Sequence, residues 1–178
     1  MVLSNTILSV VAKNILPSCF SAVTHYNEAR EICKGASCME IRKVSIRLRS
    51  VIDGDETHCE YIGEYRQMEG SHLIAYTDYT GNAVTKVGIE ARDNAMLLHR
   101  VGSITADMLF EPGAETVVNY EALSLRSRFI LHTYEYHMIQ GDEDLGIYTE
   151  YSLYDGSGEP AIRGAQEITI TFWEDENA

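Results

Sequence analysis

Apolar and polar side chains alternate along residues 41–173, with short turns between the alternating runs, and this period of two constrains the fold more than any other feature. Its clearest instance lies at residues 121–154, where two long runs rich in Tyr, Ile and Thr flank a loop that contains Gly141, Asp142 and Gly146. A short polar loop with glycine between two such runs is typical of an antiparallel hairpin. We therefore expect two long paired strands here.

The same pattern repeats along the chain and predicts about ten strands. We expect them near residues 41–49, 58–68, 72–79, 84–91, 95–101, 104–110 and 115–122, then in the two runs of the long hairpin, and finally near 162–173. Connections this short favour antiparallel pairing of neighbours, because a parallel crossover needs a dozen or more residues. Closure would remove both exposed edges of so long a meander. The prediction is an all-β, antiparallel up-and-down β-barrel of eight to ten strands, with a two-sheet sandwich as the alternative.

Residues 1–38 differ from the rest, and we divide the chain into this N-terminal extension and a barrel domain of residues 39–178. The extension lacks strand alternation and contains apolar residues at roughly helical spacing, which predicts a short irregular or helical segment. The interpretation we favour is that translation begins at Met39 and that residues 1–38 are not native. A helical extension and an export signal are the alternatives, although no Lys or Arg precedes the apolar part.

Charge and cysteine content narrow the classes of function. The chain has 14 Lys and Arg against 27 Asp and Glu, a formal charge of -13, so polyanions such as nucleic acid and anionic membranes would be repelled. No apolar run approaches the roughly 20 residues that span a bilayer. One of the four cysteines falls after residue 39, which is unlike a disulfide-rich secreted domain. We expect a cytoplasmic protein without nucleic-acid or membrane partners; protein partners are not indicated by the sequence.

Signatures of catalysis and of cofactors are missing from the sequence. It contains no G-x-S-x-G motif and no glycine-rich phosphate loop before a helix. Zinc would require three or four converging ligands; a composite site from His72, His99 and His132 stays open, although single strand histidines are more often structural. We expect no metal, no cofactor and no catalytic residue. An enzyme that uses His132 with Asp78 or Glu135 is the least favoured class.

Two groups of residues are candidates for the wall of a ligand cavity. In the strand at residues 126–138, alternation places His132, Tyr134 and Tyr136 on one face, and tyrosine suits such a wall because it combines apolar area with a hydroxyl. Alternation alone does not say whether this face points inward. The second group is Arg100 with Tyr76 and Asp78. An arginine inside a barrel could bind a carboxylate ligand, or it could pair with Asp78 or Glu90 as a structural salt bridge, the interpretation we favour.

Several short motifs in order resemble one known group. They are Gly63-Glu64-Tyr65, Ala75-Tyr76-Thr77-Asp78, Arg100-Val101-Gly102, Tyr120, residues 147–153 and residues 168–172. Together they resemble the uncharacterised YwiB-like bacterial proteins over residues 41–172, although a glycine expected within residues 123–128 is missing. The resemblance implies a barrel similar to the calycins, which include the lipocalins, and it transfers no active site.

Two hypotheses about function follow. The first is a non-enzymatic binder of a small amphipathic or apolar molecule, for instance a hydrophobic or carboxylate ligand, in a cavity of a few hundred Å³ or more. Its candidate wall residues are Tyr76, Asp78, Arg100, Tyr120, His132, Tyr134 and Tyr136. The alternative is a structural or protein-interaction module, because small barrels are commonly filled by their own side chains.

Overall fold

The computed structural model describes residues 40–80, 83–122 and 125–173, which form a closed barrel of ten antiparallel strands. The strands are β1 (Arg42–Ile52), β2 (Asp55–Met68), β3 (Ser71–Thr80), β4 (Ala83–Arg92), β5 (Ala95–Gly102), β6 (Ile104–Phe110), β7 (Glu115–Ala122), β8 (Leu125–Gln140), β9 (Asp144–Tyr154) and β10 (Pro160–Phe172). The predicted up-and-down barrel is confirmed. The predictions for residues 1–38 lie outside the described residues. Within the described part of the chain, no helix is long and apolar enough to cross a membrane.

Pairing between the first and the last strand closes the barrel. The register runs without a break from Val44 opposite Phe172 to Ile52 opposite Gly164, and β1 pairs with β2 along its other edge. Both edges of the meander are thereby satisfied. The sandwich alternative is wrong, because it would leave two separate sheets.

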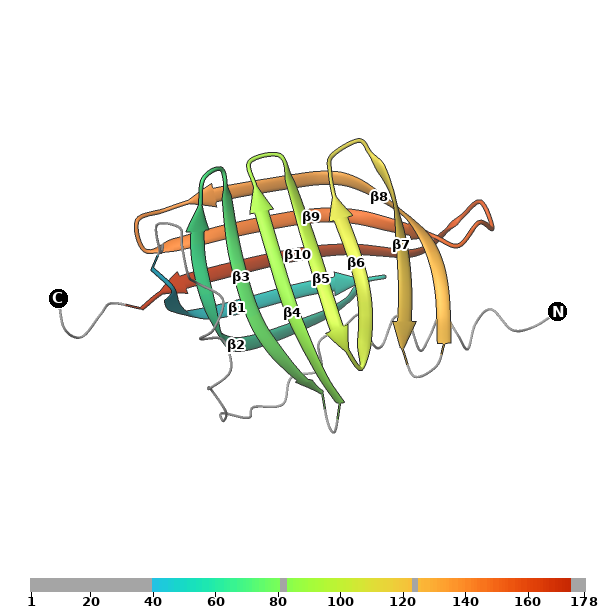
Figure 1. The fold of residues 1–178 in the computed structure, drawn as a ribbon. Coiled ribbons are helices and arrows are strands. Elements are labelled where there is room, and N and C mark those ends of the chain that lie inside the picture. The colour runs from blue at the N-terminus through green and yellow to red at the C-terminus, as the bar shows by residue number, and fades with distance from the viewer. Residues whose placement is uncertain (1–39, 81–82, 123–124, 174–178) are drawn as a thin grey trace.

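The barrel is flattened into two layers that cross one another. In Figure 1, β3 to β7 form one layer, and β9, β10 and β1 run across their direction in the other. Strand β8 belongs to both layers, since it pairs with β7 up to His132 and then continues beside β9 to its end. A β-bulge between Thr133 and Glu135 lies where it passes from one layer to the other. The Gly113 N–H donates to the Thr133 carbonyl oxygen at 3.0 Å there, in place of a regular ladder bond.

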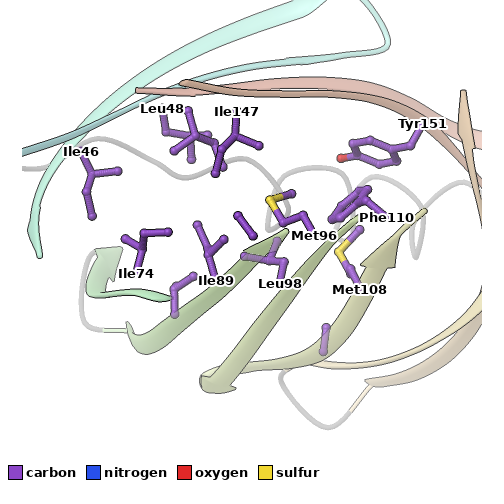
Figure 2. Close-up of a cluster of buried hydrophobic side chains, with 14 of the residues drawn as sticks. Ile46, Leu48, Ile74, Ile89, Met96, Leu98, Met108, Phe110, Ile147 and Tyr151 are labelled. Carbon is purple, nitrogen blue, oxygen red and sulfur yellow. The ribbon is translucent and has the colours of Figure 1, made fainter. Parts of the chain in front are cut away.

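Apolar side chains from both layers meet between the layers to form the core. Figure 2 shows Ile46, Leu48 and Ile147 on one side of this space, with Ile74 and Ile89 facing them. The alternation of burial along each strand agrees with one inward and one outward face. Within the described ranges, Asp78 and Arg100 are the only Asp, Glu, Lys or Arg side chains that are buried.

A glycine ends β5 two residues after the buried arginine. Gly102 has φ +138°, and a Cβ built on it would lie 2.3 Å from the carbonyl oxygen of Val84. The neighbouring Ser103 exchanges two hydrogen bonds with Val84, through its N–H at 3.0 Å and its Oγ at 3.1 Å. Only glycine allows the two strands to approach so closely. The contact holds the end of β5 against β4 and thereby helps to position Arg100, which lies two residues earlier in the strand.

We predict that Gly102→Ala lowers the free energy of unfolding by roughly 2 kcal/mol or more, because it adds both backbone strain and a collision with main-chain atoms. The measurement is urea unfolding followed by circular dichroism. Gly88→Ala is the matched control: its Cβ would meet nothing closer than 4.0 Å, so that variant should unfold at the same urea concentration or a higher one. Equal stability of Gly102→Ala and the parent chain would contradict the prediction.

Candidate functional site

The inward-facing neighbours of Arg100 form a row that crosses six strands. The pairing registers place in this row, in order, Gly63, Tyr76, Val87, Arg100, Ala106 and Tyr120. We call these six residues the Arg100 layer. Arg100 has a small side chain on each side, and the tyrosines stand two strands away in either direction, roughly 10 Å between backbones. The layer therefore combines one cation with two phenols on a single inner wall.

Arg100 is buried without a matching carboxylate. Its side chain is 5% exposed, and its Nε has no hydrogen-bond partner. None of the ion pairs between described residues includes it. The predicted alternative pairing with Glu90 is wrong, since Glu90 lies on the outward face of β4 and pairs with Arg92. A buried guanidinium with a donor to spare is costly unless something accepts from it.

Two tyrosines stack on one side of the layer. The rings of Tyr61 and Tyr76 lie 4.5 Å apart between centroids with 28° between their planes. Burial raises the pKa of Tyr76 to about 12, against the opposing effect of Arg100. Burial also raises the pKa of Tyr61, and the carboxylate of Asp78 adds to that increase. Both phenols therefore stay protonated at neutral pH.

Tyr151 approaches from the opposite layer of the barrel. It is 1% exposed and lies across from Gly164 on β10, where a Cβ would come within 2.6 Å of the tyrosine ring. Figure 2 shows the ring facing Phe110, and the two centroids are 5.2 Å apart. Burial raises the pKa of Tyr151 to about 12, with Arg100 opposing. The hydroxyl of Tyr151 is thus within electrostatic reach of Arg100.

Tyr120 is the fourth tyrosine whose pKa is affected by the charge of Arg100. Tyr120 is 4% exposed, and burial raises its pKa while Arg100 lowers it. Unpartnered buried oxygen atoms are found on Tyr61, Tyr120 and Tyr151, all of which respond to the charge of Arg100. The arrangement can donate several hydrogen bonds to an acceptor inside the barrel.

The structure brings together four of the seven predicted wall residues: Tyr76, Asp78, Arg100 and Tyr120. Tyr136 is also buried, but its hydroxyl donates to the Arg92 carbonyl oxygen at 2.7 Å, at the opposite end of β4. His132 and Tyr134 lie on the outer face, where Tyr134 is 47% exposed and hydrogen-bonds Ser152 and Tyr154.

The bulge in β8 explains why the sequence misplaced that face. Strict alternation put Tyr134 and Tyr136 on the same side of the strand, but the extra residue at Thr133/Glu135 reverses the alternation. Thr133 and Tyr136 therefore both point inward, although their spacing is odd. The placement of His132, Tyr134 and Tyr136 on one face was wrong for this reason.

Sequence reasoning also missed Tyr61 and Tyr151. Tyr61 belongs to none of the short motifs, and Tyr151 lies in one of them, residues 147–153, whose strand pattern does not single it out. A signal was present for Tyr151: Gly164 is the one glycine in the middle of the last strand, and glycine inside a strand often marks a close approach by a larger group.

The residues proposed for metal binding and for catalysis do not converge. Among the described residues, no group of three His, Cys, Asp or Glu could hold a metal ion. His72 is buried, whereas His99 is exposed and contacts Asp107. The pairing of His132 with Asp78 is wrong because one side chain points outward and the other inward, and Glu135 lies beside His137 at 3.7 Å.

Two hollows lie mainly on the outer surface. One of about 760 Å³ lies between the β1–β2 turn and the ends of β8, β9 and β10, with Asp53, Tyr134 and Arg163 in its wall. The other, of about 370 Å³, covers β2 to β5 around Ala75 and Gly88. The predicted internal cavity stays a prediction.

A buried polar pair, Tyr65 and His72, lies at the end of the barrel away from Arg100. The hydroxyl of Tyr65 and Nδ1 of His72 are 2.8 Å apart, and the ring of Phe172 packs on Tyr65 at 4.7 Å. Burial lowers the pKa of His72, with Asp93 partly opposing this effect. In contrast to Arg100, this group has its partner within the chain.

Comparisons with known proteins agree with the fold. The family model described as Domain of unknown function (DUF1934) matches residues 44–164. The crystal structure of the ywiB protein from Bacillus subtilis is similar, with a TM-score of 0.65 and 18% sequence identity over 76% of this chain and 96% of that one. A search of curated proteins found no match. The resemblance noted in the sequence is confirmed.

We predict that acidification from pH 7.5 to 5.5 lowers the free energy of unfolding partly through His72. Its pKa is lowered in the folded state, so the unfolded chain binds the proton more readily, and stability falls as the pH drops through the unfolded value of about 6.5. The measurement is urea unfolding at both pH values. His72→Gln should lose less stability than the parent chain does, whereas the exposed control His58→Gln should lose as much. An unchanged loss in His72→Gln would contradict the prediction.

Proposed function

Since this chain belongs to the family described as Domain of unknown function (DUF1934), we propose a function from its own geometry: the barrel is a non-enzymatic binder of a small amphipathic molecule. The polar end of that molecule meets Arg100 and the surrounding tyrosines. Its apolar part lies among the core side chains between the two layers.

The observation that carries this proposal is the unmatched buried arginine. Removing a guanidinium from water costs several kcal/mol unless a partner offsets the loss. Arg100 has no ion pair among the described residues, and its Nε has no acceptor. An anionic acceptor from outside the chain would form the missing ion pair and would accept a hydrogen bond from Nε. The tyrosine hydroxyls nearby would donate hydrogen bonds to the same acceptor.

The side chains around the layer suit an apolar tail. Met96, Leu98, Met108 and Phe110 are buried on the wall that continues from Arg100, and Figure 2 shows them facing Ile147 and Tyr151. Methionine is unbranched and adapts its shape, so a core with two methionines beside each other can rearrange around a guest. The binding of a ligand therefore requires side chains to move, while the strands keep their pairing.

Native mass spectrometry of the full chain, purified from its own host, tests the proposal directly. We expect a reproducible extra mass of a few hundred daltons that organic extraction removes. A chain that carries no extra mass before extraction, and that gains none from a panel of lipids and metabolites, would count against binding.

We predict that Arg100→Met abolishes retention of the extra mass while the apo chain unfolds within about 1.5 kcal/mol of the parent. Methionine fills a similar volume without a charge to desolvate. Retention is measured by native mass spectrometry and stability by urea unfolding. Arg128→Met, on the exposed face of β8, is the control and should keep the ligand.

A double-mutant cycle with Asp78→Asn separates this function from a structural salt bridge. If Arg100 served only to balance Asp78, Arg100→Met alone would cost about 3–5 kcal/mol and the two changes together would cost much less than their sum. Under the proposal, the coupling between the two positions is small in the apo chain, and ligand retention depends on Arg100.

The second candidate is a protein-interaction module, and the hollow over β2 to β5 is the observation that favours it. Leu73, Leu97 and the small residues Ala75 and Gly88 line an apolar surface there. Ile41 also lines the hollow and is 43% exposed. Exposed apolar surface next to charged residues is typical of contacts between proteins.

For this candidate we predict that Gly88→Arg, which fills the hollow, removes any protein that co-purifies with the tagged full chain, while Gly88→Ala retains it. The readout is affinity purification followed by mass spectrometry. The same partner set with both variants, or none with the parent chain, would contradict an interaction at this hollow.

A further inference from the structure

We infer that the polar end of the ligand is a single carboxylate, bound by three donors: Nε of Arg100 and the hydroxyls of Tyr120 and Tyr151. The inference rests on the proposed function and specifies the chemical class that the same site accepts. It also assigns the ligand to one side of the Arg100 layer, away from Asp78.

Each of the three donors is buried and lacks a partner. Arg100, Tyr120 and Tyr151 are 5%, 4% and 1% exposed, and the named nitrogen and oxygen atoms make no hydrogen bond of ordinary geometry, although the buried side chain of Gln166 lies close enough to the Tyr151 hydroxyl to lower its pKa. They come from β5, β7 and β9, so both layers of the barrel contribute. Native interiors leave few such groups unsatisfied, and two hydroxyls that respond to the charge of the third donor, Arg100, indicate a common acceptor.

The acceptor should be an anion, because none of the three donor groups is itself negatively charged. Burial keeps Tyr120 and Tyr151 protonated, and arginine has no acceptor atom. Hydrogen bonds from a guanidinium and from phenols to an ionised oxygen are shorter and stronger than those to a neutral one. An alcohol could accept the same bonds, but its hydrogen bond with the guanidinium would be weaker than that of an anion.

Charge balance favours a carboxylate over a phosphate monoester. Arg100 is the only buried Arg or Lys in the described ranges, and Asp78 is buried as well. Added beside Arg100 and Asp78, a monoanion brings one further negative charge into the interior, whereas a dianion brings two, close to an existing carboxylate. The flat shape of a carboxylate also matches the planar guanidinium.

The position of Asp78 indicates on which side of Arg100 the ligand carboxylate lies. Its charge acts on Tyr61 and Tyr76, which stack against each other, whereas Arg100 is the charge that acts on Tyr120. A carboxylate on the Tyr76 side would be repelled by Asp78. On the other side it meets Tyr120 and Tyr151, and its tail lies toward Phe110, which contacts Tyr151.

Three probes that share one tail test the head group. Isothermal titration of the delipidated full chain with dodecanoate, dodecanol and dodecyl phosphate should give one site, with dodecanoate at least roughly 10-fold tighter than the other two. Equal binding of dodecanoate and dodecanol, or tighter binding of the phosphate, would overturn the carboxylate assignment and leave interior binding intact.

Tyrosine variants test the position. Tyr120→Phe and Tyr151→Phe should each weaken dodecanoate binding about 10-fold and leave dodecanol binding within about twofold. Tyr148→Phe, on the outer face of β9, is the control and should bind dodecanoate like the parent chain. A larger loss for Tyr76→Phe than for Tyr120→Phe would overturn the assigned side. Circular dichroism and urea unfolding show that each variant is folded.

Failure of the inference and failure of the proposed function are distinguishable. If none of the three probes binds, and the chain from its own host carries no extractable mass, the proposed function itself fails. If an extractable ligand is found and it lacks a carboxylate, only the inference about the head group fails.

Discussion

The pairing of β1 with β10 is the constraint on which the rest of the structure depends. It joins the two ends of the meander from Val44 to Ile52, so no strand edge is left over and the inner faces of all ten strands are removed from water together. Closure also sets the dielectric environment of the interior. A guanidinium on an open sheet would be solvated, whereas the same group behind a closed wall interacts strongly with any nearby charge or dipole.

Two of the buried polar groups of the barrel, His72 and Arg100, illustrate the consequence. At one end, Tyr65 and His72 satisfy each other, and an aromatic ring covers them, which is the arrangement expected of a structural pair. At Arg100 the donors outnumber the acceptors. Stability alone would favour an apolar side chain at such a position, so the arginine is better explained by recognition than by folding. This contrast makes the Arg100 layer, and not the buried histidine, the candidate site.

The layer also shows how small residues position a large one. Val87 and Ala106 flank Arg100, Gly102 lets β5 turn two residues after it, and Gly164 accommodates the ring of Tyr151. Each of these contacts joins strands that are adjacent in the barrel. The site is therefore built on paired strands with little freedom to shift, which suits recognition of a polar group in a defined orientation.

The sequence by itself determined that there are about ten strands, that they pair in antiparallel order, and that each has two alternating faces, because period-two alternation and short turns are local properties that closure does not change. It also singled out Tyr76, Asp78, Arg100 and Tyr120 among seven candidate wall residues. Only the tertiary structure decided that Tyr76, Arg100 and Tyr120 share a row, that Tyr151 joins them from the opposite side, and that Tyr136 faces inward, away from Tyr134. The first two depend on register and on the crossing of the two layers, and the third on a bulge formed with the distant β6–β7 turn. Such contacts join residues far apart in the chain, so no local pattern encodes them.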